Sequence, residues 1–179
     1  LAVSFTQNNG FYFPVNGDNK KLIRSLFEDE GLQKVGFDLK FAIKVFSNHD
    51  IILQGQLFDV QIAHYLLHPD MRNSLDIISE NYLGIALKED QSIIGKGKTK
   101  VPFSSLKSSL LTDFAAERAS AIYNLAAVFK NEMKEVSVFD LFEKIELPLI
   151  KVLARMELEG IALDVNMLRS YSEELTFEV

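Results

Sequence analysis

The sequence contains no cysteine and no tryptophan, and it has only 4 prolines among 179 residues. Without cysteine there can be no disulfide and no thiolate metal site, which fits an intracellular protein. No apolar run approaches the roughly 20 residues needed to cross a bilayer, so we expect no membrane association. No signal peptide is visible, and Leu1 already lies inside an apolar run. We therefore expect the chain to be a fragment.

The chain also has no excess of basic residues, since 19 Lys and Arg are outnumbered by 25 Asp and Glu. The net charge of −6 repels phosphate backbones on average and excludes a broad basic footprint for duplex DNA. A contact with nucleic acid would have to come from a local site or a basic neighbour. What is present is 47% hydrophobic residues, including 14 Phe. That composition predicts one compact domain with a core of Phe, Leu and Ile.

The hydrophobic pattern predicts strands early in the chain, with helices between and after them. Apolar segments on either side of the turn signal at residues 8–10 predict a β-hairpin over residues 1–15. Further strands are expected at residues 34–37 and in the segment framed by 51–53 and 57–58. Helices are expected at residues 19–29, 38–48, 60–67 and 74–83, with Asn19, Asp38 and Asp59 at the first three starts.

The second half of the chain is predicted to be mostly helical. Residues 88–102 are polar and predict an exposed loop, and the pattern is helical from Phe103 onward. Pro148 is expected to bend that helical stretch or to begin a new helix. Gly160 predicts a stop, and Asp164 is expected to cap a last helix that ends near Leu175. These elements together indicate an α/β or α+β layered domain.

Two histidines, His64 and His68, are four residues apart on one predicted helix face. That spacing could chelate a metal ion, but a useful site needs a third ligand and the sequence marks none. The simpler interpretation is a pair of histidines at the surface or at a helix end. We therefore expect no metal site.

Residues 95–100, with the sequence GKGKTK, invite comparison with a phosphate-binding loop. They lack the spacing of that loop and do not lead from a strand into a helix. A solvated basic loop is the simpler interpretation, with a weak DNA-backbone contact as the alternative. The hydrolase motifs G-x-S-x-G and H-E-x-x-H are absent. Residue patterns alone therefore indicate no more than an intracellular α/β domain.

Two short segments, residues 35–42 (VGFDLKFA) and residues 114–118 (FAAER), carry distinctive patterns. They resemble the second motif, V-G-x-N-x-K-Y-D, and the third motif, Y-A-A-E-D, of the 3′→5′ exonuclease domain of the bacterial DNA polymerase I family (family A). The similarity extends to residues 57–67, 74–76, 82–84 and 95–98 and, in the start of the polymerase part, to 142–149, 152–157, 160–161 and 172–175. The similarity is collinear over nearly the whole chain.

This resemblance implies an α/β fold with a ribonuclease H-like mixed sheet flanked by helices and a helical C-terminal extension. Residues 1–134 would form the exonuclease-like domain, and residues 135–179 the N-terminal base of the polymerase domain. The first motif, D-x-E, would lie upstream of Leu1 and outside the chain. The implied partners are DNA, reached through the full-length polymerase in replication and repair, and the downstream polymerase domain. The implied location is the bacterial cytoplasm, in association with the nucleoid.

An active exonuclease of this family resembles a two-metal hydrolase in which carboxylates hold divalent ions. Such ions require oxygen ligands. Here the Asp of the second motif falls on Ala42, the Asp of the third on Arg118, and the water-orienting Tyr on Phe114. The Asn of the second motif has become Asp38. The resemblance thus predicts a domain that has lost its catalytic carboxylates, does not proofread, and acts as a structural scaffold.

Two other interpretations stay open. In the first, the exonuclease is active with rearranged ligands and needs Mg²⁺ or Mn²⁺; no cofactor is expected otherwise. Its weak candidate ligand is Asp38, which could share a helix face with Ala42, and further carboxylates nearby in the motifs are Asp59, Asp113 and Glu117.

In the second interpretation, the domain is a vestigial module for single-stranded DNA. Bases would then stack on aromatic rings. The candidate rings are Phe41, Phe103 and Phe114, although burial in the core is the expected role of all three. The candidate contacts with nucleic acid are Lys40, Lys96 and Lys98.

Overall fold

The computed structural model describes residues 1–7, 9–15, 17 and 19–178. It begins with a hairpin in which β1 (Ala2–Thr6) pairs antiparallel with β2 (Asn9–Tyr12), as predicted. Strand β2 ends earlier than expected, and Pro14 lies just beyond its end. Proline has no N–H group with which to extend a ladder of hydrogen bonds. Asn8, part of the predicted turn, lies outside the described residues.

A second sheet pairs β3 (Lys34–Gly36) with β4 (Leu57–Asp59) in parallel. The predicted strand at residues 34–37 is confirmed, whereas the segment 51–53 is not a strand. Ile51 and Leu53 are buried in the core, but their segment forms no ladder of hydrogen bonds with a strand. Within the described residues, the β structure therefore consists of two separate two-stranded sheets.

Four helices of the first half confirm the prediction: α1 (Lys20–Phe27), α2 (Leu39–Ser47), α3 (Val60–Leu67) and α4 (Leu75–Leu83). The predicted loop at residues 88–102 is partly wrong. It contains helix α5 (Asp90–Ile94) and a 3-10 turn, η1 (Gly97–Thr99). The side chain of Ile94 is buried. The backbone carbonyl of Ile94 accepts a hydrogen bond from Val101 N at 2.8 Å. Burial of this apolar residue holds part of the segment against the body of the protein.

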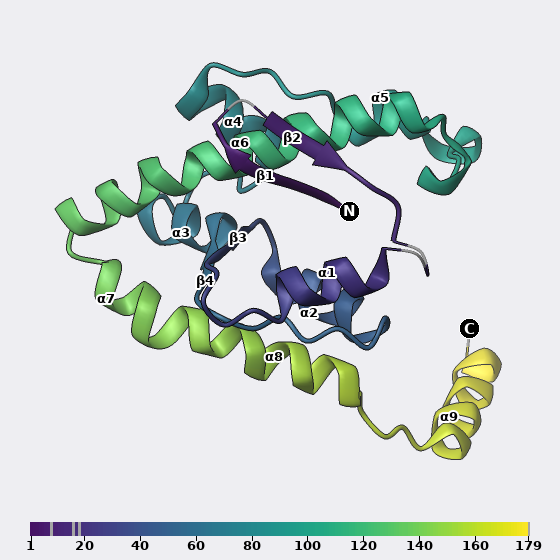
Figure 1. The fold of residues 1–179 in the computed structure, drawn as a ribbon. Helices are drawn as coiled ribbons and strands as arrows, with labels where there is room; N and C mark the ends of the chain where they lie inside the picture. The colour runs from purple at the N-terminus through teal and green to yellow at the C-terminus, as the bar shows by residue number, and fades with distance from the viewer. Residues whose placement is uncertain (8, 16, 18, 179) are drawn as a thin grey trace.

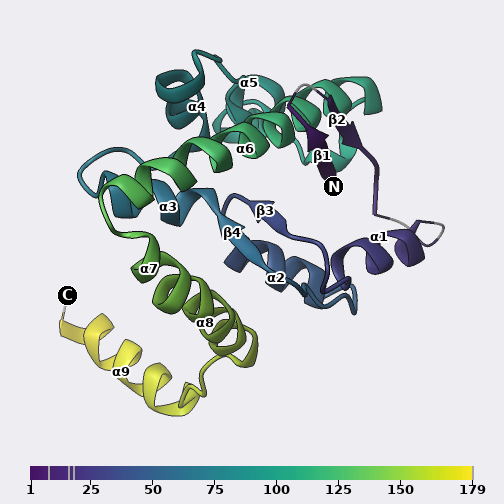
Figure 2. The same ribbon diagram turned by 60° about the vertical axis from the view of Figure 1, so that its left-hand side comes forward.

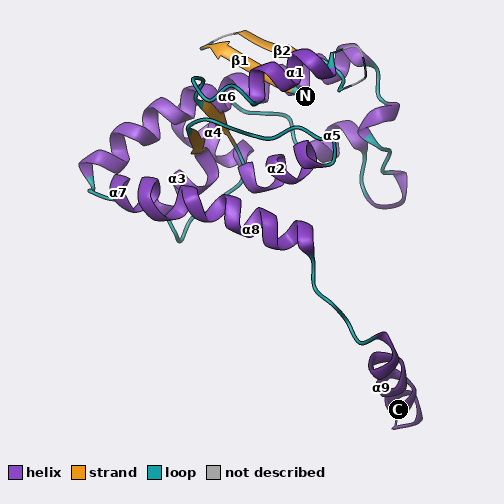
Figure 3. Cartoon of the chain, turned by 60° about the horizontal axis from the view of Figure 1, so that its bottom comes forward, coloured by secondary structure: helices purple, strands orange, loops and turns teal. Residues whose placement is uncertain are grey.

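The remaining helical run is confirmed, with several breaks. It comprises η2 (Phe103–Ser105), α6 (Ser108–Glu135), α7 (Phe139–Leu141), a π-helical turn η3 (Phe142–Glu146), α8 (Leu147–Glu159) and α9 (Val165–Glu178). Pro148 lies in the first turn of α8, as predicted. Asp164 caps α9 by accepting a hydrogen bond from Met167 N at 3.0 Å. Figure 3 shows α9 standing away from the other elements on an extended linker. No helix within the described ranges is long and apolar enough to span a membrane.

Strand β4 separates two hydrophobic clusters, because its successive side chains point to opposite faces. Phe58 faces a cluster that we call the closed core, and Leu57 faces a second cluster that we call the open core. The buried residues of the closed core are Phe58, Val60, Ala63, Leu75, Ile78, Leu87, Ala121, Leu125, Ala126, Phe129, Met133 and Phe142. Those of the open core are Ile23, Leu39, Phe46, Ile51, Leu53, Leu57 and Ile150.

The long helix α6 carries the N-terminal hairpin (Figures 1 and 2). Gly10 of β2 lies against the backbone of Ala116, where any Cβ atom would clash. Two side chains of α6 bind the turn of the hairpin: Ser120 Oγ and Asn124 Nδ2 donate to the carbonyl of Gln7 at 2.5 and 3.0 Å. The hairpin is thereby placed on α6 and not beside β3.

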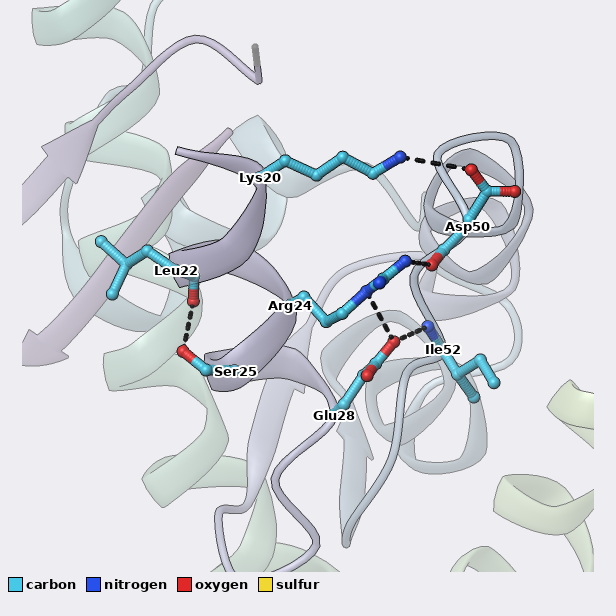
Figure 4. A network of polar contacts seen from close by, with 7 residues as sticks. All are labelled: Lys20, Leu22, Arg24, Ser25, Glu28, Asp50 and Ile52. Carbon is cyan, nitrogen blue, oxygen red and sulfur yellow. Dashed lines mark hydrogen bonds and ion pairs between the residues drawn. The ribbon is translucent and has the colours of Figure 1, made fainter. Parts of the chain in front are cut away.

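Polar contacts tie α1 to the loop that follows α2 (Figure 4). Lys20 Nζ lies 3.2 Å from Asp50 Oδ2, and Arg24 donates to the carbonyl of Asp50. Glu28 Oε1 accepts a hydrogen bond from Ile52 N at 3.0 Å. These contacts place α1 over the open core, where Ile23 of α1 is buried.

Candidate active-site region

The second motif forms the turn between β3 and α2. Asp38 is the N-cap of α2 and has a left-handed backbone with φ of 56°, and its Oδ1 accepts a hydrogen bond from Phe41 N at 3.1 Å. Because Asp38 precedes the helix, it does not share a helical face with Ala42 as the sequence suggested. Its carboxylate instead satisfies one of the free N–H groups of the first turn.

Asp59 caps two helices at once. Its Oδ1 accepts from Gln61 N at 2.9 Å and Ile62 N at 3.2 Å at the start of α3, and its Oδ2 accepts from Leu39 N at 2.6 Å at the start of α2. The side chain is 1% exposed. Burial raises the pKa of this carboxyl above its usual value. The three N–H donors partly offset that increase in pKa, and the charge of Asp38 adds to it. Asp59 is therefore a structural carboxylate that joins the second motif to the segment at residues 57–67.

Ala42 borders an apolar groove of about 550 Å³ between β1 and β3, which we call the β1–β3 groove. Other lining side chains include Val3, Val35, Phe41 and Tyr123. The methyl group of Ala42 also packs against the open core. Asp38 and Asp59 are not among the residues that line the groove. The groove therefore presents an apolar surface at the position of the second-motif Asp.

The third motif lies on α6, where Phe114 and Arg118 are stacked. The guanidinium carbon of Arg118 is 4.3 Å from the centroid of the Phe114 ring, which is 7% exposed. Arg118 Nη2 donates to the carbonyl of Lys88 at 2.8 Å and to Asp90 Oδ1 at 2.9 Å. Arg118 thus connects α6 to the segment that leads into α5. The acidic partner of Arg118 is Asp90.

Lys40, a predicted nucleic-acid contact, forms an ion pair within the protein. Its Nζ lies 2.7 Å from Glu157 Oε1 of α8, and Lys44 binds the other oxygen of the same carboxylate. The hydrogen bonds from the two lysines lower the pKa of Glu157 to about 2. The bond with Glu157 also raises the pKa of Lys40. These contacts join α2 to α8.

The other two predicted contacts, Lys96 and Lys98, are exposed in and beside η1. Of the three aromatic candidates, only Phe114 is buried as expected. Phe41 is 59% and Phe103 is 39% exposed, so the expectation of burial is wrong for both. The rings of Phe103 and Phe114 have their centroids 5.9 Å apart. The predicted contacts therefore do not converge on one site in the structure.

The two histidines are neighbours but do not form a metal site. Both lie at the C-terminal end of α3, as one predicted alternative had it, with His64 in the last turn and His68 as the C-cap. His64 is fully buried, so the alternative of a surface position is wrong for it. Its Nδ1 lies 3.1 Å from Asn73 Oδ1, and burial lowers the pKa of the imidazole below its usual value. Tyr82 and Phe129 pack around the ring. Within the described ranges, no group of three or more His, Asp or Glu side chains could hold a metal ion.

The residues of the two motifs do not fit a two-metal site. Ala42 and Phe114 have no ligand atom, and Arg118 is a permanent cation. The carboxylate of Asp59 already accepts hydrogen bonds from three backbone N–H groups. Asp113 and Glu117 are exposed on α6 beside the hairpin residues Asn9 and Gly10. No metal-dependent step can be assigned to this arrangement.

Two partners in this region were not anticipated from the sequence, namely Asp90 and Glu157. Asp90 lies in a stretch whose polar composition indicated a loop, and Glu157 lies on a helix distant in sequence from Lys40. No local pattern links either acid to its basic partner. Only the tertiary fold, which places Asp90 beside α6 and packs α8 on α2, brings these charges together.

Comparison with known proteins agrees with this fold. Residues 1–125 match the family described as DNA polymerase I, ribonuclease H-like domain. The chain is 29% identical to DNA polymerase I of Borreliella burgdorferi over 178 residues, covering 94% of this chain and 19% of the relative. It is 30% identical to DNA polymerase I of Bacillus subtilis over 182 residues, covering 98% of this chain and 20% of the relative.

A similar solved structure is described as the POL domain of Pol1 from M. smegmatis in complex with DNA primer-template and dNTP. It has a TM-score of 0.73 and 24% identity, and the match covers 91% of this chain and 25% of that one. This likeness concerns the fold alone. The chain spans about a fifth of the length of the curated relatives that it matches.

The small sheets flanked by helices define an α/β protein of the ribonuclease H-like class. The family match covers well over half of the chain. The chain belongs to the DNA polymerase I family and contains its ribonuclease H-like domain.

Proposed function

We propose that this chain is the exonuclease-type domain of a DNA polymerase I that no longer proofreads and that supports the polymerase domain structurally. The domain ends near residue 134, and residues 135–179 form the base of the polymerase domain. The end of α6 at Glu135 supports this boundary. The longer protein then acts on DNA in replication and repair, in the cytoplasm of a bacterium.

The observation that carries the proposal is the arrangement around Arg118. A guanidinium at a ligand position opposes a divalent cation by its charge. Here it is also bound to Asp90 and to the carbonyl of Lys88, and it lies over Phe114. Arg118 therefore has a structural role that is incompatible with a ligand role. Ala42, at the other motif position, supplies no oxygen.

A supporting role is favoured by the contacts between the two proposed parts. Glu157 of α8 binds Lys40 and Lys44 of α2, and Ile150 of α8 is buried in the open core. Phe142 of the π-helical turn is buried in the closed core, with its ring centroid 4.9 Å from that of Phe58. The π-helical turn η3 and α8 are thus anchored to the two cores.

The test uses the full-length polymerase that carries this chain, with a single-stranded oligonucleotide labelled at its 5′ end. Incubation with Mg²⁺ or Mn²⁺ should leave the oligonucleotide intact, while primer extension with nucleotides proceeds. Stepwise loss of 3′ nucleotides would contradict the proposal and favour an exonuclease with rearranged ligands. In that case Asp38→Ala should abolish the loss, because Asp38 is the candidate ligand that the second motif supplies.

Binding of single-stranded DNA without cleavage is a second candidate function. It is favoured by the exposure of Phe41 and Phe103 and of the loop residues Lys96 and Lys98. Stacking on aromatic rings and contacts from mobile lysines are common in such sites. Filter binding at low salt tests this function, with Lys96→Ala/Lys98→Ala compared with Lys20→Ala on α1. Equal affinity of the two variants would remove the loop from the proposed contact surface.

A further inference from the structure

The segment around α5, η1 and η2 carries a local excess of positive charge. Residues 91–112 contain four lysines and no acidic residue, in a chain whose net charge is −6. Three of these lysines, Lys96, Lys98 and Lys100, lie within residues 94–101, which we call the lysine loop. All three are exposed, and among the residues that the structure describes none forms an ion pair with them. The lysine loop is therefore a basic surface on an acidic protein.

Backbone hydrogen bonds close the lysine loop on itself. Val101 N donates to the carbonyl of Ile94 at 2.8 Å, and the side chain of Ile94 is buried. Inside the loop, Thr99 N and Thr99 Oγ1 both donate to the carbonyl of Lys96, at 3.2 and 2.8 Å. Gly95 has a φ of 83°, and a Cβ atom there would lie 2.8 Å from the carbonyl oxygen of Thr99. The lysines are thus carried on a turn of defined shape, which reduces the entropy lost when they bind a partner.

Two substituted positions of the third motif hold the two ends of the lysine loop. Before the loop, Asp90 Oδ1 accepts a hydrogen bond from Arg118 Nη2 at 2.9 Å. After the loop, the ring centroid of Phe103 lies 5.9 Å from that of Phe114. The guanidinium carbon of Arg118 lies 4.3 Å from the centroid of Phe114, so the two anchoring side chains contact each other. A carboxylate at position 118 would instead repel Asp90.

We propose that Arg118, stacked on Phe114, is a positioning residue for the lysine loop, which binds the phosphodiester backbone of single-stranded DNA. The inference rests on the second candidate function above and extends it, because it names the contact surface and the residue that orients it. Lysine binds a phosphate as a point charge, and each such contact releases counterions from the nucleic acid. The lysines of α2 are not equivalent, since Lys40 and Lys44 are already paired with Glu157.

The first experiment compares two triple variants of equal charge, with EDTA present so that no metal-dependent cleavage interferes. The loop variant is Lys96→Ala/Lys98→Ala/Lys100→Ala. The control variant, at exposed positions on α1, α6 and α8, is Lys21→Ala/Lys130→Ala/Lys151→Ala. Fluorescence anisotropy measures the affinity of the 179-residue chain for a labelled single-stranded oligonucleotide over a range of salt concentrations. Circular dichroism first establishes that the variants retain their helical content.

We expect the loop variant to bind about 10-fold more weakly than the original chain. Its slope of log K against log salt concentration should fall in magnitude by about 2, because each phosphate contact with a single strand contributes about 0.7. The control variant should keep the original slope. Equal losses in the two variants would overturn the proposal but leave the second candidate function standing. Absence of binding by the original chain at low salt would overturn both.

The second experiment tests whether Arg118 positions the lysine loop. Asp90→Asn and Glu89→Gln each remove one negative charge, which by itself strengthens binding to DNA, but of the two acids only Asp90 pairs with Arg118. We expect Asp90→Asn to bind DNA about 2- to 5-fold more weakly than Glu89→Gln, which is the range of an exposed ion pair. The amide of Val101, which closes the loop, should also exchange its hydrogen faster in Asp90→Asn. Equal strengthening of binding in the two variants would overturn the positioning role of Arg118.

Discussion

The closed core and the open core differ in how completely they are enclosed. Phe129, Met133 and Leu125 of α6 lie in the closed core and are fully buried between α3, α4 and the π-helical turn. In the open core, Leu39 and Phe46 are buried on one side but border the β1–β3 groove on the other. A side chain in this protein can therefore be buried and still line a groove.

The difference has a physical origin in the two kinds of element. Helices satisfy their own backbone groups, so three helices can enclose the closed core by side-chain packing alone. The open core is covered in part by short strands, and a strand satisfies its backbone only through neighbours. The closed core is therefore enclosed by helices, whereas the open core borders the β1–β3 groove.

The largest effect is expected from truncating the closed core. Phe129→Ala should reduce the free energy of unfolding by about 3–5 kcal/mol, because it removes a fully buried ring and leaves a cavity. The matched change Phe41→Ala, at the groove, should cost less than about 1 kcal/mol, since that ring is 59% exposed. Urea unfolding followed by circular dichroism measures both. Similar losses for the two variants would remove the distinction between the cores.

A smaller effect is expected at Asp59, which links the two cores by capping α2 and α3. Asp59→Ala should cost about 2–3 kcal/mol, because three backbone N–H groups lose their acceptor in a buried site. Asp164→Ala, which removes one exposed cap from α9, is the matched control and should cost about 1 kcal/mol or less. If the two changes cost the same, Asp59 does not couple the helices.

The closed core should also respond to pH through His64. Burial lowers the folded-state pKa of this imidazole below the ordinary value of 6.5, so below that pH the unfolded chain binds a proton that the folded chain resists. Stability should fall by up to about 1.4 kcal/mol per pH unit from about pH 6.5 down to the folded-state pKa. The urea midpoint, measured between about pH 7.5 and about pH 5.5, tests this slope.

Two variants identify the histidine responsible. His64→Asn should lower stability at neutral pH and reduce the pH slope, whereas His49→Asn, at an exposed position, should leave the slope unchanged. Asp59 contributes in the opposite sense at lower pH, because its folded-state pKa is raised and stability then increases as the pH falls. An unchanged slope in His64→Asn would show that the imidazole is not held neutral by the core.

The smallest effect is expected for the ion pair between Arg118 and Asp90, which attaches the α5 segment to α6. Asp90 is exposed, so a double-mutant cycle with Arg118→Met and Asp90→Asn should give a coupling of about 0.2–1 kcal/mol that weakens with salt. Arg118→Met keeps an apolar contact with Phe114 and isolates the charge. A coupling of zero at low salt would mean that Arg118 is held by stacking and by Lys88 alone.

Local features of the fold were predictable because they depend on neighbouring residues. Asp38, Asp59 and Asp164 were recognised as helix starts, and each accepts a hydrogen bond from a backbone N–H two or three residues ahead. The segment around Ile94 was misjudged, since its polar flanks outweighed one apolar side chain that the body of the protein buries. The burial of His64 was missed because a helix periodicity does not reveal which neighbours cover each face.

The sequence by itself determined the order of the elements and the helix starts, because these depend on local residue patterns. It also determined the resemblance to one polymerase family, because that resemblance depends on short motifs in a fixed order. It also determined that Ala42, Phe114 and Arg118 lack metal-binding oxygens, which follows from side-chain chemistry. Only the tertiary structure decided that Arg118 binds Asp90, that Glu157 binds Lys40, and that β1 and β3 are separated by a groove. Those outcomes depend on how α6, α8 and the two sheets pack, and packing joins residues that no sequence spacing connects.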